Sequence, residues 1–186
     1  MIAMKNILIY FDYPITSIQG GTEQASFLLA RLLVRQGFRI IFLSLHPFKK
    51  KNNEFPQYSL PDSEYLFSRR NADFTEKLCD EQNINFILNE GAASDSSFFF
   101  SHAHLNTKAT IVSIINFSIW EGLDHFLSLI PPSGNTWPAK LKTAARVVSA
   151  PWKKYMAIRK KKAKLNHLLE YSDKVVVLSQ KYIQDC

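Results

Sequence analysis

The chain has 186 residues, 46% of them apolar, so it can bury one substantial core but is too short for two ordinary enzyme domains. No apolar run approaches the roughly 20 residues that span a bilayer, and the start of the chain does not read as a signal peptide. The two cysteines, Cys79 and Cys186, have no metal-ligand spacing and no framework of partners, which favours a reducing, cytoplasmic setting over a disulfide-rich class.

Positive charge is concentrated in one segment. Lys and Arg total 23 against 16 Asp and Glu. Ten of these bases lie between Trp137 and Leu169, where there is no acid, which leaves thirteen bases and sixteen acids elsewhere. The sequence therefore predicts a mildly acidic body that carries one basic patch.

The start of the chain has the pattern of a strand, a helix and a second strand. Lys5–Phe11 is a short apolar run typical of a strand buried on both faces of a parallel sheet. After a loop over Asp12–Gly21, Thr22 can cap a helix, and Gly37 stands where a left-handed helix stop is needed. Arg39–Leu45 resumes the strand pattern, so we expect a right-handed βαβ unit.

The first helix is predicted to have a single apolar face. Arg31 and Arg35 would point away from it, into solvent. The apolar residues recur at i, i+3, i+4, i+7 and i+8, and they are Ala25, Leu28, Leu29, Leu32 and Leu33.

The remaining segments continue the alternation of helix and strand. Residues 46–70 predict an irregular excursion with one short strand near Tyr65. The ordered segments predicted after it are a helix over Ala72–Gln82, a strand over Ile84–Asn89, a helix over Ser96–His104, a strand over Ala109–Phe117, two helical stretches within the basic segment 137–170, a strand over Lys174–Ser179 and the start of a helix over Gln180–Cys186. This rhythm predicts one Rossmann-like, doubly wound α/β domain over residues 1–186.

The loop after the first strand has features of an anion-binding turn. Such loops bind ligands in α/β folds, and the free N–H groups at the start of the following helix favour an anion. Gly20 and Gly21 let the backbone approach a ligand closely, although a plain turn is the alternative for a Gly-Gly pair. The G-x-G-x-x-G signature of dinucleotide-binding loops is not present.

Two motifs give the chain a resemblance to family 4 glycosyltransferases. Gly20-Gly21-Thr22-Glu23 and the residues that follow it resemble the family's opening, GG-x-E…LA-x-x-L…G. Tyr171–Ser179 resembles the a-D-x-v-i-x-x-S strand that closes the first domain of that family. The first match continues through Ala25, Leu29, Ala30, Leu33, Gly37 and the strand RIIFLS.

The resemblance implies a GT-B enzyme, in which two Rossmann-like domains face each other across a cleft. This chain would be the amino-terminal, acceptor-side half of a retaining, metal-independent transferase. Its partners would be a nucleotide-sugar donor, a glycan or lipid-linked acceptor in cell-surface polysaccharide synthesis, and its own donor-binding second domain. That domain, with its E-x7-E motif, is not in these residues, so we expect the chain to be inactive alone.

The resemblance and the strand ends together select the candidate cleft residues. Gly20 and Gly21 would lie at the donor diphosphate or the acceptor, whereas Glu23 can equally be a first-turn carboxylate that favours the helix dipole. Many family members carry a histidine after the strand that here ends in Asn116 and Phe117, so no catalytic residue is assigned. The other candidates follow strand ends and are Glu90, Asn116, Ser118, Trp120 and Glu121.

Several other kinds of site are disfavoured. His102 and His104 would point to different faces of a helix, and no further ligand stands near them in sequence, so no zinc site is expected. There is no G-x-S-x-G elbow and no Walker phosphate loop, which removes the hydrolase and kinase classes. Phe98-Phe99-Phe100 is predicted to pack a helix against the sheet.

The basic segment is predicted to meet an anionic membrane surface at the inner face of the membrane. Bases near such a surface contribute about 1 kcal/mol each, and indole rings settle at the headgroups. The candidate membrane-facing residues are Trp152, Lys153, Lys154, Arg159, Lys160 and Lys161. The alternative is a solvated surface helix that packs through Tyr155, Ile158, Leu165 and Leu169. Specific nucleic-acid binding ranks below both, because no such motif accompanies the charge.

A second functional hypothesis belongs to a different class. The same fold could serve as a non-catalytic, Rossmann-like binding domain or as a membrane adaptor. Vesicle binding without any sugar-dependent signal would distinguish that hypothesis from the transferase.

Overall fold

A single parallel sheet organises the molecule. The computed structural model describes residues 5–15, 21–47, 54–91, 95–115 and 137–177, apart from the side chains of Thr22 and of residues 137–150. Within these ranges six strands pair in the order β3-β2-β1-β4-β5-β6, and every neighbouring pair is parallel. The strands are β1 (Asn6–Phe11), β2 (Arg39–Ser44), β3 (Gln57–Ser59), β4 (Ile84–Asn89), β5 (Thr110–Ile115) and β6 (Lys174–Val177). The predicted doubly wound α/β fold is therefore confirmed.

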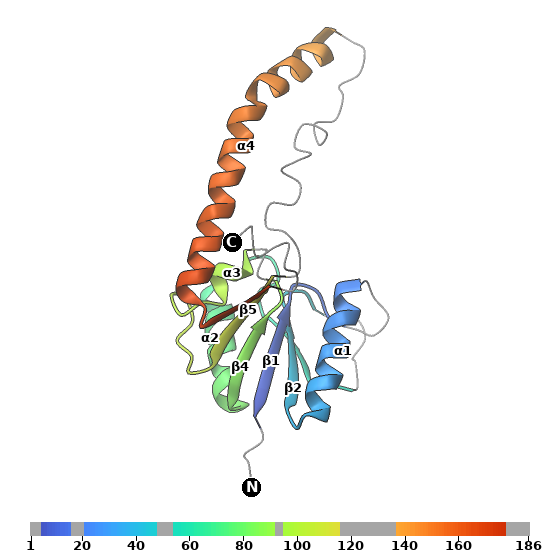
Figure 1. Cartoon of the computed structure of the whole chain (residues 1–186), viewed down its shortest axis with the longest axis vertical. Helices are drawn as coiled ribbons and strands as arrows, with labels where there is room; N and C mark the ends of the chain where they lie inside the picture. Colours follow the sequence, from blue (N-terminus) through green and yellow to red (C-terminus); the bar gives the residue numbers. More distant parts are fainter. Residues whose placement is uncertain (1–4, 16–20, 48–53, 92–94, 116–136, 178–186) are drawn as a thin grey trace.

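Helices cover both faces of this sheet. The helices are α1 (Gly21–Arg35), α2 (Arg69–Glu81), α3 (Ser96–Phe99) and α4 (Trp137–Tyr171). Figure 1 shows α1 beside β1 and β2, α2 and α3 near β4 and β5, and α4 rising well beyond the carboxyl ends of the strands. The long helix therefore projects past the edge of the sheet where α/β proteins bind ligands.

The central strand β1 contributes side chains to two hydrophobic cores, one on each face of the sheet. Ile7 and Ile9 of β1 are buried in the cluster that contains Phe27 of α1, whereas Leu8 and Tyr10 are buried in the cluster that contains Leu78 of α2. Successive side chains of a strand point to opposite faces, so a continuous apolar run is required where both faces are covered.

The buried face of α1 differs from the predicted one. Leu28 and Leu32 are 57% and 54% exposed, whereas Ser26, Phe27 and Ala30 are buried. The leucine pattern predicted the wrong buried face of α1. The face that is buried contains the polar residue Ser26, which an apolar pattern does not detect. Arg31 is half exposed, as predicted.

Gly37 ends α1 in the expected way. Its φ is +88°, in the left-handed region, and the Phe38 N–H donates to the Leu33 carbonyl at 3.1 Å. The Gly37 N–H donates to the Val34 carbonyl at 2.9 Å. These two bonds form the Schellman arrangement that satisfies the last carbonyls of a helix.

Three element boundaries were predicted wrongly. The short strand in residues 46–70 is β3, not a segment near Tyr65, and Pro56 just before it accepts a bond from the Phe42 N–H of β2. Helix α2 begins before Ala72, because the Ser68 hydroxyl accepts from the Asn71 N–H and caps the helix. Helix α3 ends at Phe99, where the chain turns and the Ser101 hydroxyl donates to the Phe98 carbonyl.

The basic segment forms one helix and not two. Helix α4 runs through Pro151, which lacks the N–H that would bond to the preceding turn. Only the last turns of its described part meet the body: Leu165 and Leu168 are buried with Ile115 of β5. The Phe100 ring packs at a tilt against Tyr10, with 4.2 Å between ring centroids, as expected of the phenylalanine run, and Phe98 contacts the His167 ring of α4 at 4.6 Å.

Asp173 connects α4, β5 and β6. Its Oδ2 accepts the Ile111 N–H at 2.7 Å and lies 2.7 Å from His102 Nε2. The Asp173 N–H in turn donates to the Ile111 carbonyl at 3.0 Å. The aspartate of the second motif therefore has a structural role at the start of these strands.

Candidate functional site

The strand order places a switch point between β1 and β4. The chain moves outward from β1 to β2 and β3 on one side, and returns to β4, β5 and β6 on the other. The carboxyl ends of strands at such a point bind ligands in open α/β sheets. Asp12 follows β1, Glu90 follows β4, and the two strands are hydrogen-bonded neighbours up to Tyr10 and Asn89.

Glu90 is held at this edge in a buried position. The Glu90 side chain is 7% exposed, and its carboxyl group accepts a hydrogen bond from the Ser26 hydroxyl of α1. The Glu90 N–H donates to the Tyr10 carbonyl at 3.1 Å, which fixes the residue at the end of β1. Glu90 thus joins three elements at the switch point.

Burial changes the acidity of this carboxyl group. Loss of solvation raises the pKa of Glu90 to about 7, and the hydrogen bond from Ser26 only partly opposes that effect. Both protonation states are therefore populated near neutral pH, and the group can accept or donate a proton at this edge.

A network of short polar contacts supports the carboxyl end of β4. The Ser96 hydroxyl lies 2.6 Å from the Gly91 carbonyl and 3.0 Å from Asn89 Oδ1, and the Gly91 N–H donates to that same Asn89 oxygen at 3.1 Å. A Cβ atom at Gly91 would lie 2.6 Å from the Ser96 hydroxyl. A side chain at position 91 would therefore force the buried Ser96 side chain or the backbone to shift.

Three further contacts were not predicted from the sequence. The Tyr10 hydroxyl donates to Asp12 Oδ1 at 2.8 Å, and burial raises the pKa of Tyr10, which keeps the phenol as a neutral donor. The His46 N–H, after β2, donates to the Asp12 carbonyl at 3.1 Å, and the His46 ring lies 4.9 Å from the Tyr13 ring. The positions of Asp12 and Tyr13 after β1, and of His46 after β2, were the available signal.

The start of α1 reaches the same edge. Gly21 is exposed, and no described atom lies within 4 Å of a Cβ built on it. Neither a left-handed backbone nor close packing within the described residues therefore requires glycine here. Glu23 is a half-buried carboxylate in the first turn, where the dipole favours it.

The predicted site residues fall into two groups. Of the predicted residues, Gly21 and Glu23 belong to α1, and another residue of that helix, Ser26, contacts the predicted residue Glu90 directly. The predicted residues Gly20, Asn116, Ser118, Trp120 and Glu121 lie outside the described residues.

The predicted membrane-facing residues lie on α4, away from this edge. Trp152 is 67% exposed, and Lys153, Lys154, Arg159 and Lys160 are exposed, whereas Lys161 is half-buried. Among the described helices, none has the length and hydropathy that crossing a bilayer requires.

The two histidines disfavoured as zinc ligands have other contacts. His102 bonds to Asp173, and the His104 ring packs against Phe99 at 5.0 Å. Burial lowers the pKa of His104. No cluster of three or more His, Cys, Asp or Glu side chains suited to a metal ion occurs in the described ranges.

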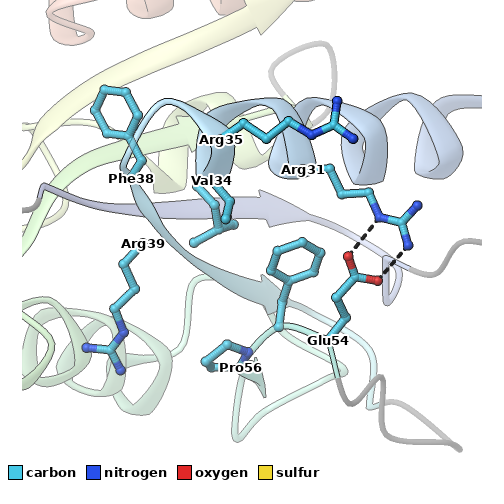
Figure 2. A pocket seen from close by; sticks show the side chains of 9 residues that line it. Arg31, Val34, Arg35, Phe38, Arg39, Glu54 and Pro56 are labelled. Atoms are coloured by element: carbon cyan, nitrogen blue, oxygen red, sulfur yellow. Dashed lines mark hydrogen bonds and ion pairs between the residues drawn. The ribbon is translucent and has the colours of Figure 1, made fainter.

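A surface groove of about 540 Å³ lies elsewhere, at the start of β2 (Figure 2). Arg31 closes one end through a two-bond ion pair with Glu54, at 2.7 and 2.8 Å. Its lining comes from the second half of α1, the start of β2 and residues 54–56. The groove contains none of the residues at the switch point.

The fold and the carboxyl edge define a Rossmann-like α/β domain with a polar site at its switch point. No protein-family model matches the chain, and no curated protein matches it in sequence.

Proposed function

We propose that this chain is the amino-terminal, acceptor-binding half of a retaining glycosyltransferase that works at the cytoplasmic side of the membrane. The enzyme transfers a sugar from a nucleotide-sugar to a glycan or lipid-linked acceptor in cell-surface polysaccharide synthesis. The observation that carries the proposal is the contact of Glu90 with Ser26, next to the start of α1, at the switch point of a 3-2-1-4-5-6 sheet.

The start of α1 is suited to the leaving group of such a reaction. Transfer breaks the bond between the anomeric carbon and the diphosphate oxygen, so negative charge grows on the diphosphate. Free N–H groups and the dipole at a helix start stabilise that charge. The space in front of Gly21 would admit phosphate oxygens close to the backbone.

Glu90 is suited to the acceptor side of the reaction. An acceptor hydroxyl must lose a proton as it forms the new bond to the anomeric carbon, and a carboxylate with a pKa of about 7 can accept that proton. In this proposal Asp12, which is held by a hydrogen bond from the buried Tyr10 hydroxyl, orients the acceptor from the end of β1.

The test uses the protein encoded by the whole reading frame that contains this chain. We would measure the transfer of labelled sugar into membrane extracts of the source cells. The donors are UDP-glucose, UDP-N-acetylglucosamine and GDP-mannose. Gly21→Glu, which places a carboxylate where the diphosphate would lie, should lower turnover at least a hundredfold. Gln36→Glu adds the same charge at the far end of α1 and should leave turnover near that of the unaltered protein.

A normal turnover for Gly21→Glu would show that the assignment of this loop is wrong. The second candidate, a non-catalytic binding or membrane-adaptor domain, is favoured by the exposed aromatic and basic residues of α4. Vesicle binding by a full-length protein that transfers sugar from none of the three donors would support that candidate.

A further inference from the structure

Among the described side chains, those of α4 that pack on the body lie near its carboxyl end. Leu165 and Leu168 are buried there, and Lys164 Nζ forms an ion pair with Asp95 Oδ1 at 2.5 Å. Figure 1 shows the rest of the helix rising past the carboxyl edge of the sheet. The stretch from Pro151 to Ala163 has no buried residue.

Large apolar side chains are nevertheless exposed on that stretch. Trp152 is 67% exposed, Tyr155 is 55% exposed and Met156 is 43% exposed. They stand at i, i+3 and i+4, so they share one face of the helix, and the rings of Trp152 and Tyr155 lie 5.9 Å apart. Ala163 extends the same face, since it lines a shallow depression with Met156.

This face points away from the body. An α-helix turns by about 100° per residue, so Leu168 and Leu165 lie about 160° and 220° around the axis from Trp152. These two leucines face the sheet, so Trp152 lies on the opposite side of the helix. Its side chain therefore does not serve to pack α4 on the domain. We name Trp152, Tyr155 and Met156 the apolar face of α4.

Cations surround the apolar face, and no acid interrupts them. Between Trp152 and Leu169 the sequence has seven Lys or Arg and no Asp or Glu. Lys153, Arg159 and Lys160 are exposed beside the face. Indole, phenol and thioether side chains combined with bases suit the surface of a lipid bilayer, where an apolar acyl layer lies beneath anionic headgroups.

We propose that this part of α4 docks on an anionic lipid surface, with the apolar face among the acyl chains and headgroups and the flanking bases on lipid phosphates. The inference goes beyond the proposed transferase function and does not depend on it. A nucleic acid would satisfy the bases but would leave the exposed Met156 and Trp152 without an apolar environment. Because α4 rises past the carboxyl edge, docking would bring the candidate site toward the membrane.

The experiment is flotation of the full chain with vesicles at low salt. Vesicles of phosphatidylcholine and phosphatidylglycerol should carry the protein to the top of the gradient, and vesicles of phosphatidylcholine alone should not. High salt should weaken the binding, because counterions screen exposed charges. Equal binding to both kinds of vesicle, or to neither, would overturn the proposal.

Paired variants distinguish vesicle binding through the apolar face of α4 from nonspecific binding through any exposed apolar residue. Trp152→Ser with Tyr155→Ser should lower vesicle affinity at least tenfold. Leu28→Ser with Leu32→Ser removes two equally exposed apolar residues from α1 and should leave affinity unchanged. An equal loss in both pairs would contradict the assignment, and thermal unfolding would confirm that every variant is folded.

A second pair tests the charge. Lys153→Glu with Lys160→Glu should abolish binding to anionic vesicles, whereas Lys108→Glu with Lys174→Glu, on exposed positions of the body, should change it less than threefold. Equal losses would mean that net charge alone drives binding and would overturn the assignment to α4. Tighter binding to duplex DNA than to vesicles, unchanged by Trp152→Ser, would make this a nucleic-acid surface and overturn the proposal.

Discussion

At the scale of single residues, Glu90 makes stability depend on pH. Its folded-state pKa of about 7 lies above the ordinary value of 4.5, so between these values the folded state binds more protons than the unfolded state. The stabilising contribution is complete below about pH 4.5 and is lost as the pH rises through 7, by about 3 kcal/mol as an order of magnitude.

Glu90→Gln should remove that dependence. The amide oxygen can still accept from Ser26 but does not ionise, so the variant should gain about 3 kcal/mol over the unaltered chain at pH 8 and little at pH 4.5. Urea unfolding at several pH values measures the difference. The same loss of stability between pH 5 and 8 in both proteins would place the titration on another group.

A pair of glycines tests the packing of the switch point. In Gly91→Ala the new methyl would lie 2.6 Å from the Ser96 hydroxyl, which is itself buried and held by Asn89 and the Gly91 carbonyl, so overpacking should cost about 1–3 kcal/mol. Gly21→Ala meets no described atom and should change stability by less than about 0.5 kcal/mol. Equal unfolding midpoints in urea would contradict the crowding around Gly91.

Residue patterns predicted only part of the site. The position of Glu90 followed from the end of an apolar run, because the carboxyl ends of parallel strands meet at one edge. Its partner Ser26 could not be found this way, since a hydrogen bond between residues 64 apart leaves no periodic signal. Asp12 and His46 also follow strand ends, but a polar residue after a strand is most often a loop residue.

At the scale of elements, α1 gives the sharpest test of which face is buried. Phe27 is 3% exposed and its ring packs against Phe55 at 5.4 Å, so Phe27→Ala should cost about 3–5 kcal/mol. Leu28→Ala, one residue further on, should cost less than about 0.5 kcal/mol, because that side chain is 57% exposed. Chemical unfolding of both variants decides between this face and the one that the leucine pattern predicted.

The elements differ in how well the sequence predicted them. Strands β1, β2 and β4 were found to within a residue, because both faces of the sheet are covered there and each run is mostly apolar. Strand β3 was misplaced, since an edge strand of three half-buried residues, Gln57–Ser59, carries no such signal. Helix α4 was predicted as two helical stretches, but it runs on through Pro151, because a helix can continue through a proline at the loss of one hydrogen bond.

At the scale of the whole molecule, stability should be uneven between the sheet and α4. Strand β1 lies between β2 and β4 and has a covered face on each side, so its amides should exchange with solvent only through global unfolding. The stretch from Pro151 to Ala163 has no buried residue, and helices without tertiary cover are marginal in water. Its amides should therefore exchange through local opening, orders of magnitude faster.

Hydrogen exchange read by mass spectrometry on the dilute chain measures this difference. Peptides from residues 164–171, which include the buried Leu165 and Leu168, provide the internal control and should exchange at an intermediate rate. Equal protection of the exposed stretch and of β1 would mean that a second copy or another partner covers the apolar face in solution. Fast exchange that slows only when anionic vesicles are added would instead connect the uncovered helix to the lipid surface, because burial at that surface supplies the cover that the body does not.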